Sequence, residues 1–184
     1  MNNTAKRNTF GIVTAALFTA IITVCSQIAI PMPSNVPLTL QTFGIALCGY
    51  ALGVKWGFAS ITAYVLLGAV GVPVFAGFKG GIQSLFAASG GFIYGFILLA
   101  VLCGLSQYTK NRWLKILCGF AGLAACHILG TVHFSFVYKT GIISSFLMVS
   151  APYLIKDAVS VILAQLLSVY IKKSLAKISA QKNF

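Results

Sequence analysis

The chain has 184 residues, of which 59% are hydrophobic and only 8% are charged. Soluble domains carry roughly 25% charged residues, so this composition excludes a water-facing surface and predicts an integral membrane protein. Thirteen basic residues accompany a single acid, Asp157, for a net charge of +12. The basic residues lie between hydrophobic runs rather than in clusters beside polar contact surface, which excludes nucleic-acid binding and favours a role as topology signals.

The hydrophobic runs are too long and continuous for the alternating strands of a membrane barrel, and they predict an all-α bundle. In chain order we expect six transmembrane helices in a single membrane domain, residues 1–184: 9–30, 38–53, 57–72, 90–107, 113–138 and 152–171. The first run has about the 20 residues that a span needs, which is more than the core of a signal peptide. We therefore assign it as the first helix.

The distribution of basic residues predicts the orientation, because cytoplasmic connections are enriched in lysine and arginine. The chain ends and the short connections on one side carry Lys6, Arg7, Lys55, Lys110, Arg112, Lys115, Lys172, Lys173, Lys177 and Lys182. The other side carries Lys79, Lys139 and Lys156. This division of ten against three predicts that both termini lie in the cytoplasm.

The three outer connections, residues 31–37, 73–89 and 139–151, are long, irregular and largely apolar. Irregular backbone at membrane depth is tolerated only where protein or a water-filled cavity satisfies it. We therefore expect these segments to fold over the bundle and to cover a functional site.

Asp157 is the strongest candidate for that site, because an ionisable side chain within a membrane helix is a functional hypothesis by default. Lys156 is its neighbour, although adjacent helical side chains diverge and a direct pair is not assured, and Ser160 is within reach of both. Tyr153, Asp157, Ser160 and Ala164 form one stripe that should face the interior of the bundle. The alternative is a helix-terminal acid satisfied by backbone N–H groups and a lysine.

Other chemistries have little support in the sequence. His127 and His133 are six residues apart, so they do not share a helical face, and we expect helix-packing hydrogen bonds rather than a metal site. The glycine-rich string around Lys79 lacks the GxxxxGK[ST] pattern, so we expect no ATPase and no bound cofactor. The five cysteines form no CxxC pair and lie in apolar runs, which favours core packing over redox chemistry.

Four strings, in this order, resemble the BioY biotin transporters, the substrate-binding S components of energy-coupling factor transporters. They are "PMPSNVPLTLQTF" (31–43), "GVPVFAGFKGG" (71–81), "SGGFIYGF" (89–96) and "PYLIKDAV" (152–159). The resemblance implies six helices with cytoplasmic ends, a biotin pocket near the outer face of the plasma membrane, and biotin uptake rather than enzymatic activity. The lipids of that membrane would surround the bundle.

The resemblance also implies a partner module, composed of a membrane T component and two ATP-hydrolysing subunits. In the family an AxxxA pattern on the first helix docks on the T component, and Ala16 and Ala20 match it. Small residues four apart permit close approach of another helix, which can equally belong to the same chain.

For the site, the resemblance implies that Asp157 accepts the N–H groups of the ureido ring of biotin. Further candidates for the pocket are Gln41, Thr39, Tyr94 and Tyr153. A lysine commonly follows the family's aspartate by three residues, but here Ser160 occupies that place. We therefore expect Lys156 or Lys79 to meet the ligand's carboxylate. This departure keeps open an S component for another small vitamin-like ligand, and a membrane redox enzyme is a more distant alternative.

Overall fold

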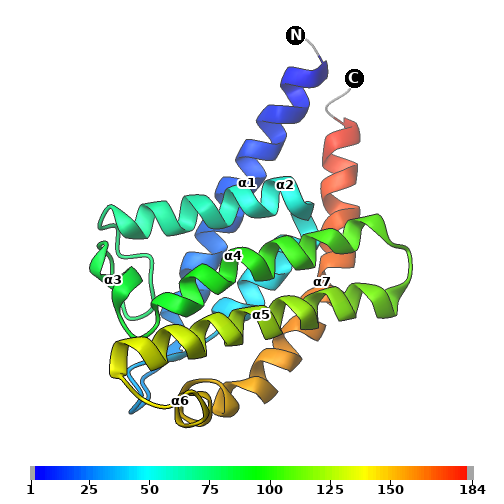
Figure 1. The fold of residues 1–184 in the computed structure, drawn as a ribbon. Coiled ribbons are helices and arrows are strands. Elements are labelled where there is room, and N and C mark those ends of the chain that lie inside the picture. The colour runs from blue at the N-terminus through cyan, green and yellow to red at the C-terminus, as the bar shows by residue number, and fades with distance from the viewer. Residues whose placement is uncertain (1–2, 182–184) are drawn as a thin grey trace.

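The computed structural model describes residues 3–181, and this part of the chain is almost entirely helical (Figure 1). The helices are α1 (Asn3–Gln27), α2 (Gln41–Ala69), α3 (Gln83–Phe86), α4 (Gly90–Leu105), α5 (Arg112–Tyr138), α6 (Ile142–Val149) and α7 (Ala151–Gln181), with a 3-10 turn at Ser106–Tyr108. A short antiparallel ribbon pairs β1 (Ala29–Ile30) with β2 (Leu38–Thr39). The predicted all-α membrane class is confirmed, since α1, α2, α4, α5 and α7 are each long and apolar enough to cross a bilayer.

Five helices of span length are found among the described residues where six were predicted, because the second and third predicted helices join in α2. The join is not straight: Gly53 has φ 76° and ψ −174°, which no α-helix contains. A Cβ atom on Gly57 would lie 3.3 Å from the Cα atom of Gly49. A straight helix would separate residues eight apart by about 12 Å, so the two legs of α2 fold back on each other.

Several predicted boundaries were wrong. Leu38 and Thr39 form β2 rather than the start of a helix, and the first helix ends at Gln27 rather than at residue 30. Both differences have the same cause, because prolines in the intervening segment cannot continue a helix: Pro31, Pro33 and Pro37. At the other end of the chain, α7 runs ten residues beyond the predicted residue 171.

The core lies where α1, α2, α4, α5 and α7 meet, and it contains the fully buried side chains of Tyr50, Tyr64, Ile45, Leu99 and Phe134. Among them, Tyr50 donates a hydrogen bond to the carbonyl of Lys115 at 2.9 Å and Tyr64 to that of Val74 at 3.2 Å. The hydroxyls of these tyrosines thus join α2 to the start of α5 and to the segment before α3.

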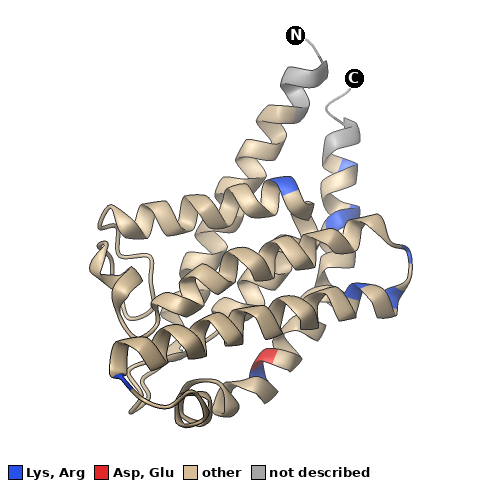
Figure 2. Ribbon diagram, in the orientation of Figure 1, with Lys and Arg blue, Asp and Glu red and all other residues tan. Residues whose placement is uncertain are grey.

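Most basic residues gather at one end of the bundle (Figure 2). The start of α1, the kink of α2 and the distal part of α7 meet there around a crevice lined by Phe10, Trp56 and Lys172. Seven of the ten predicted cytoplasmic cations belong to segments that meet at this end. They are Lys55 beside the kink of α2, Lys110, Arg112 and Lys115 at the connection from α4 to α5, which packs against that kink, and Lys172, Lys173 and Lys177 in the distal part of α7. Lys182 and the side chains of Lys6 and Arg7 lie outside the described part of the protein. Both described chain ends lie at this end as well (Figure 1).

Candidate functional site

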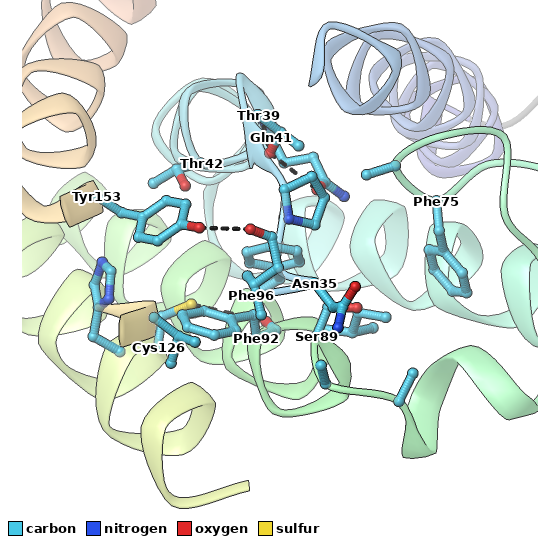
Figure 3. A pocket seen from close by; sticks show the side chains of 18 of the residues that line it. Asn35, Thr39, Gln41, Thr42, Phe75, Ser89, Phe92, Phe96, Cys126 and Tyr153 are labelled. Atoms are coloured by element: carbon cyan, nitrogen blue, oxygen red, sulfur yellow. Dashed lines mark hydrogen bonds between the residues drawn. The ribbon is translucent and has the colours of Figure 1, made fainter. Parts of the chain in front are cut away.

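A cavity of about 240 Å³ lies at the opposite end of the bundle, beneath the outer connections. A single water needs roughly 10–15 Å³ in such a measure, so the cavity has room for a small organic molecule. Phe92 and Phe96 of α4 form an aromatic wall, and Thr39, Gln41 and Tyr153 supply polar groups across the cavity from it (Figure 3). An apolar pocket with a few convergent polar groups is typical of a small-molecule binding site.

Six of the eight predicted binding residues line this cavity: Asp157, Lys156, Tyr153, Gln41, Thr39 and Lys79. Ser160 and Tyr94 do not. Ser160 is buried on the same face of α7 as Asp157. It lies outside the cavity because three residues advance a helix by about 4.5 Å along its axis. Tyr94 is 38% exposed and donates its hydroxyl to the carbonyl of Leu85 at 3.1 Å.

Asp157 is the centre of the polar wall and is only 4% exposed. The predicted inward stripe of α7 is confirmed, since Tyr153, Ser160 and Ala164 are also buried. One carboxylate oxygen, Oδ1, forms an ion pair with the ammonium group of Lys156. The adjacent residues therefore do pair directly, although their side chains leave the helix in different directions.

Lys156 has a second partner outside α7. Its ammonium group donates a hydrogen bond of 2.6 Å to the backbone carbonyl of Thr39 in β2. This cation therefore neutralises the buried carboxylate and also connects α7 to β2, whose Thr39 lines the cavity.

His127 was missed as a site residue, although it lines the cavity and is 5% exposed. Its Nε2 atom lies 3.3 Å from Oδ2 of Asp157, and its Nδ1 atom lies 3.0 Å from the hydroxyl of Ser150. The predicted helix-packing role is confirmed, because these contacts join α5 to α7. One feature of the sequence could have identified His127 as a site residue. A lone acid within the membrane is costly unless it is paired, so a polar side chain on a neighbouring helix is to be expected beside Asp157.

A Ser–His–Asp grouping invites comparison with hydrolase triads. Here the hydroxyl of Ser150 is fully buried, it does not line the cavity, and it bonds to the hydroxyl of Thr131 at 2.8 Å. A substrate in the cavity would not reach it, so the grouping is a buried hydrogen-bond array rather than a nucleophile and its base.

Metal and thiol chemistry also find little support in the geometry. No group of three or more His, Cys, Asp or Glu side chains in the described chain is placed to hold a metal ion. The five cysteines are free thiols, and of these Cys126 lines the cavity.

The outer connections fold over the cavity, as predicted. The hydroxyl of Tyr153 donates a 2.5 Å hydrogen bond to the carbonyl of Val36, which closes the segment after β1 onto α7 (Figure 3). On the other side, Gln27 at the end of α1 accepts a hydrogen bond from the N–H of Phe78 at 2.9 Å and donates to the carbonyl of Phe75 at 3.2 Å. The end of α1 thus holds the segment that carries Lys79.

Comparisons with known proteins agree with one another. A model of the BioY family matches residues 1–177. The biotin transporter BioY of Thermotoga maritima is 39% identical over 163 residues, which cover 88% of this chain and 95% of that protein. A probable biotin transporter BioY of Pyrococcus horikoshii is 40% identical over 152 residues, covering 82% of this chain and 91% of that protein.

A solved structure has the same fold. It is the crystal structure of the S-component for biotin from an ECF-type ABC transporter, which is 26% identical to this chain in sequence. The TM-score is 0.79, and the alignment covers 94% of this chain and 93% of that one.

Proposed function

The chain belongs to the BioY family, and from this premise we propose that it is the high-affinity biotin-binding membrane subunit, or S component, of an energy-coupling factor transporter for biotin uptake. The observation that carries the proposal is the cavity organised around Asp157, which is buried, partly apolar and large enough for a small molecule. The family is one of transporters, and its members are not enzymes.

The chemistry of biotin matches the two walls of the cavity. The ureido ring offers two N–H donors and a carbonyl acceptor, and the carboxylate of Asp157 is an acceptor for the donors. Thr39, Gln41 and Tyr153 supply further polar groups on the same side. The apolar thiophane ring and valerate chain would lie against the aromatic wall that includes Phe92 and Phe96.

Charge balance supports a ligand with one negative charge. The charged side chains that line the cavity are Lys79, Lys156 and Asp157. Lys156 and Asp157 neutralise each other, which leaves the ammonium group of Lys79 at the mouth. A carboxylate beside Lys79 would make the occupied site neutral, and this matters because unpaired charge is costly in a membrane.

For the arrangement in the membrane, we infer six crossings in one membrane domain, with each leg of α2 as one crossing, and cytoplasmic termini in the plasma membrane. The supporting observations are the fold-back at Gly53 and the described basic residues at the end of the bundle where the chain ends lie. A fluorescent reporter that matures only in the cytoplasm, fused after residue 184, should be bright; a dark but stable fusion would contradict this orientation.

For the partners, we infer a membrane T component and two ATP-hydrolysing subunits. Ala16 and Ala20 are exposed on the surface of α1, so they are available to a partner helix rather than used within the chain. Membrane lipids would cover the remaining apolar surface.

Biotin binding to the detergent-purified protein, measured by calorimetry, tests the proposed ligand. We expect Asp157→Asn to weaken binding by about 1 to 3 kcal/mol, or roughly 5- to 150-fold, because the ureido donors lose a charged acceptor. The double variant Asp157→Asn/Lys156→Met removes both charges. It shows whether the loss of affinity in Asp157→Asn comes from the missing acceptor or from a lysine left without its counter-ion. Ser160→Ala, on the same buried face but outside the cavity, should bind as the wild type does.

Mass spectrometry of the ligand that copurifies with the protein provides an independent test. Biotin is the expected species. If another vitamin copurified instead and biotin gave no calorimetric response, the cavity would be the binding site of that other vitamin.

A further inference from the structure

We propose that His127 is a positioning residue of the ligand site: as the neutral Nε2–H tautomer, it orients the carboxylate of Asp157 so that the carboxylate retains two acceptor sites for the paired ureido N–H groups. This inference rests on the proposed biotin function and deepens it. Nothing in the sequence motifs marks His127, which lies on α5, outside all four strings that resemble the family.

The tautomer follows from the partners of the ring. The carboxylate oxygens of an ionised aspartate only accept hydrogen bonds, so the Nε2 atom that lies 3.3 Å from Oδ2 of Asp157 must carry the proton. In a neutral ring, Nδ1 is then an acceptor. It accepts from the hydroxyl of Ser150 at 3.0 Å, and Ser150 accepts in turn from the hydroxyl of Thr131 at 2.8 Å.

Every donor in this array therefore points toward Asp157, an arrangement in which successive hydrogen bonds polarise and strengthen one another. Thr131 donates to Ser150, Ser150 to His127, and His127 to Asp157. Thr131 and Ser150 are both buried, so the array is shielded from solvent at the end that is farthest from Asp157.

The charges around the ring are already paired with each other. The titratable or charged groups that line the cavity near it are Asp157, Lys156 and Tyr153 of α7 and Cys126 of α5. Asp157 already has Lys156 as its counter-ion, so the imidazole serves the buried carboxylate as a hydrogen-bond donor and is not needed as a second counter-ion. On the α4 side the ring makes a T-shaped contact with Phe92, with centroids 5.7 Å apart.

The consequence for recognition is geometric. An ionised carboxylate has about four lone-pair sites. Lys156 occupies one at Oδ1 and His127 one at Oδ2, and these contacts come from different helices, so the carboxylate is held against rotation. Apart from the ion pair, Oδ1 has no hydrogen-bond partner among the described side chains and backbone groups. The hydroxyl of Thr42, which also lines the cavity, interacts with this carboxylate as well. A ligand that displaces this hydroxyl finds about two acceptor sites, which is the number that a ureido ring with two N–H donors requires.

The test compares biotin with an isosteric analogue in which CH₂ replaces one ureido N–H. The wild-type protein should prefer biotin, and His127→Leu should lower biotin affinity roughly tenfold while removing most of that preference, because the carboxylate is no longer oriented. His127→Gln keeps an N–H donor near the Nε2 position and should restore much of the preference. A merely structural role would weaken both ligands equally.

The chain supplies its own matched control. It has only two histidines, and His133 on the same helix bonds to the carbonyl of Ala87 at 3.0 Å rather than to Asp157. His133→Leu should leave the preference for biotin unchanged. An unchanged preference in His127→Leu would overturn the inference, whereas a wild-type protein that binds no biotin would instead overturn the proposed function.

Nitrogen NMR on the wild-type protein keeps the inference testable if His127→Leu does not fold. With two histidines the spectrum is simple, and His133→Gln assigns the signals. We expect His127 to have a protonated Nε2 and an unprotonated Nδ1 at neutral pH. A proton on Nδ1 would refute the proposed array.

Discussion

Lys79 and Lys156 both line the cavity, but their surroundings differ. Lys156 is engaged on two sides, by the carboxylate of Asp157 and by the carbonyl of Thr39. Lys79 is exposed at the mouth of the cavity, on a segment whose backbone bridge pairs it with Phe75. Removing Lys156 would therefore leave a buried carboxylate uncompensated, whereas removing Lys79 would mainly affect an incoming anion.

Binding of biotin and of its alcohol analogue, which lacks the carboxylate, separates these two roles. We expect Lys79→Met to bind biotin about tenfold more weakly and the alcohol about as well as the wild type, because only the charged ligand loses a charge-assisted contact. Lys156→Met should instead lower the thermal unfolding temperature and weaken both ligands. If Lys79→Met discriminated between the two ligands as the wild type does, the carboxylate would not lie beside Lys79.

The kink in α2 is the element on which the arrangement of the bundle depends. Its two legs can pack together only because Gly53 takes φ 76° and ψ −174°, a conformation that is essentially restricted to glycine. A Cβ atom at this position would also meet the Oε1 atom of Gln107, but that side chain is flexible and can move. The backbone conformation is therefore the main constraint.

Thermal unfolding in detergent should report this constraint. We expect Gly53→Ala to destabilise the protein by about 1 to 3 kcal/mol, because alanine is strained in this region of backbone conformation. Gly141→Ala is the matched control, since Gly141 has φ −63° and an added methyl group there would meet no atom within 4 Å. Equal unfolding temperatures for the two variants would show that the kink does not need glycine.

Across the whole molecule, α1 connects the two functional surfaces that we propose. Its middle exposes Ala16 and Ala20, and its last residue, Gln27, holds the segment that carries Phe75 and Lys79 over the cavity. The strand β1 follows α1 almost directly and leads into the other cover of the cavity. A partner that moved α1 would therefore also move both covers.

Biotin uptake in cells that contain the ATPase module tests the docking role of α1. We expect Ala20→Trp to lower the uptake rate at least about tenfold, because a large side chain prevents close helix approach, while biotin binding to the purified subunit stays unchanged. Ile155→Trp places the same side chain on the exposed surface of α7 and should leave uptake intact. Normal uptake by Ala20→Trp would place the partner elsewhere.

The helical class, most of the span positions and the burial of Asp157 inside the bundle could be predicted from the sequence, because the bilayer constrains each segment of the chain separately. Each span must satisfy its own backbone and needs about 20 apolar residues, and a lone acid is costly wherever it lies. The stripe of Tyr153, Asp157, Ser160 and Ala164 could also be assigned, since helical periodicity determines which side chains share a face.

Helical periodicity does not determine how deep a side chain lies or what it meets from another helix. For that reason Ser160 was assigned to the site although it lies beyond the cavity, and His127, 30 residues before Asp157 in the chain, was not assigned to it. The pairing of Lys156 with both Asp157 and Thr39, and the reversal at Gly53, likewise depend on contacts between segments that are distant in sequence or on one backbone conformation. Such contacts follow from packing in three dimensions, which hydropathy and spacing do not record.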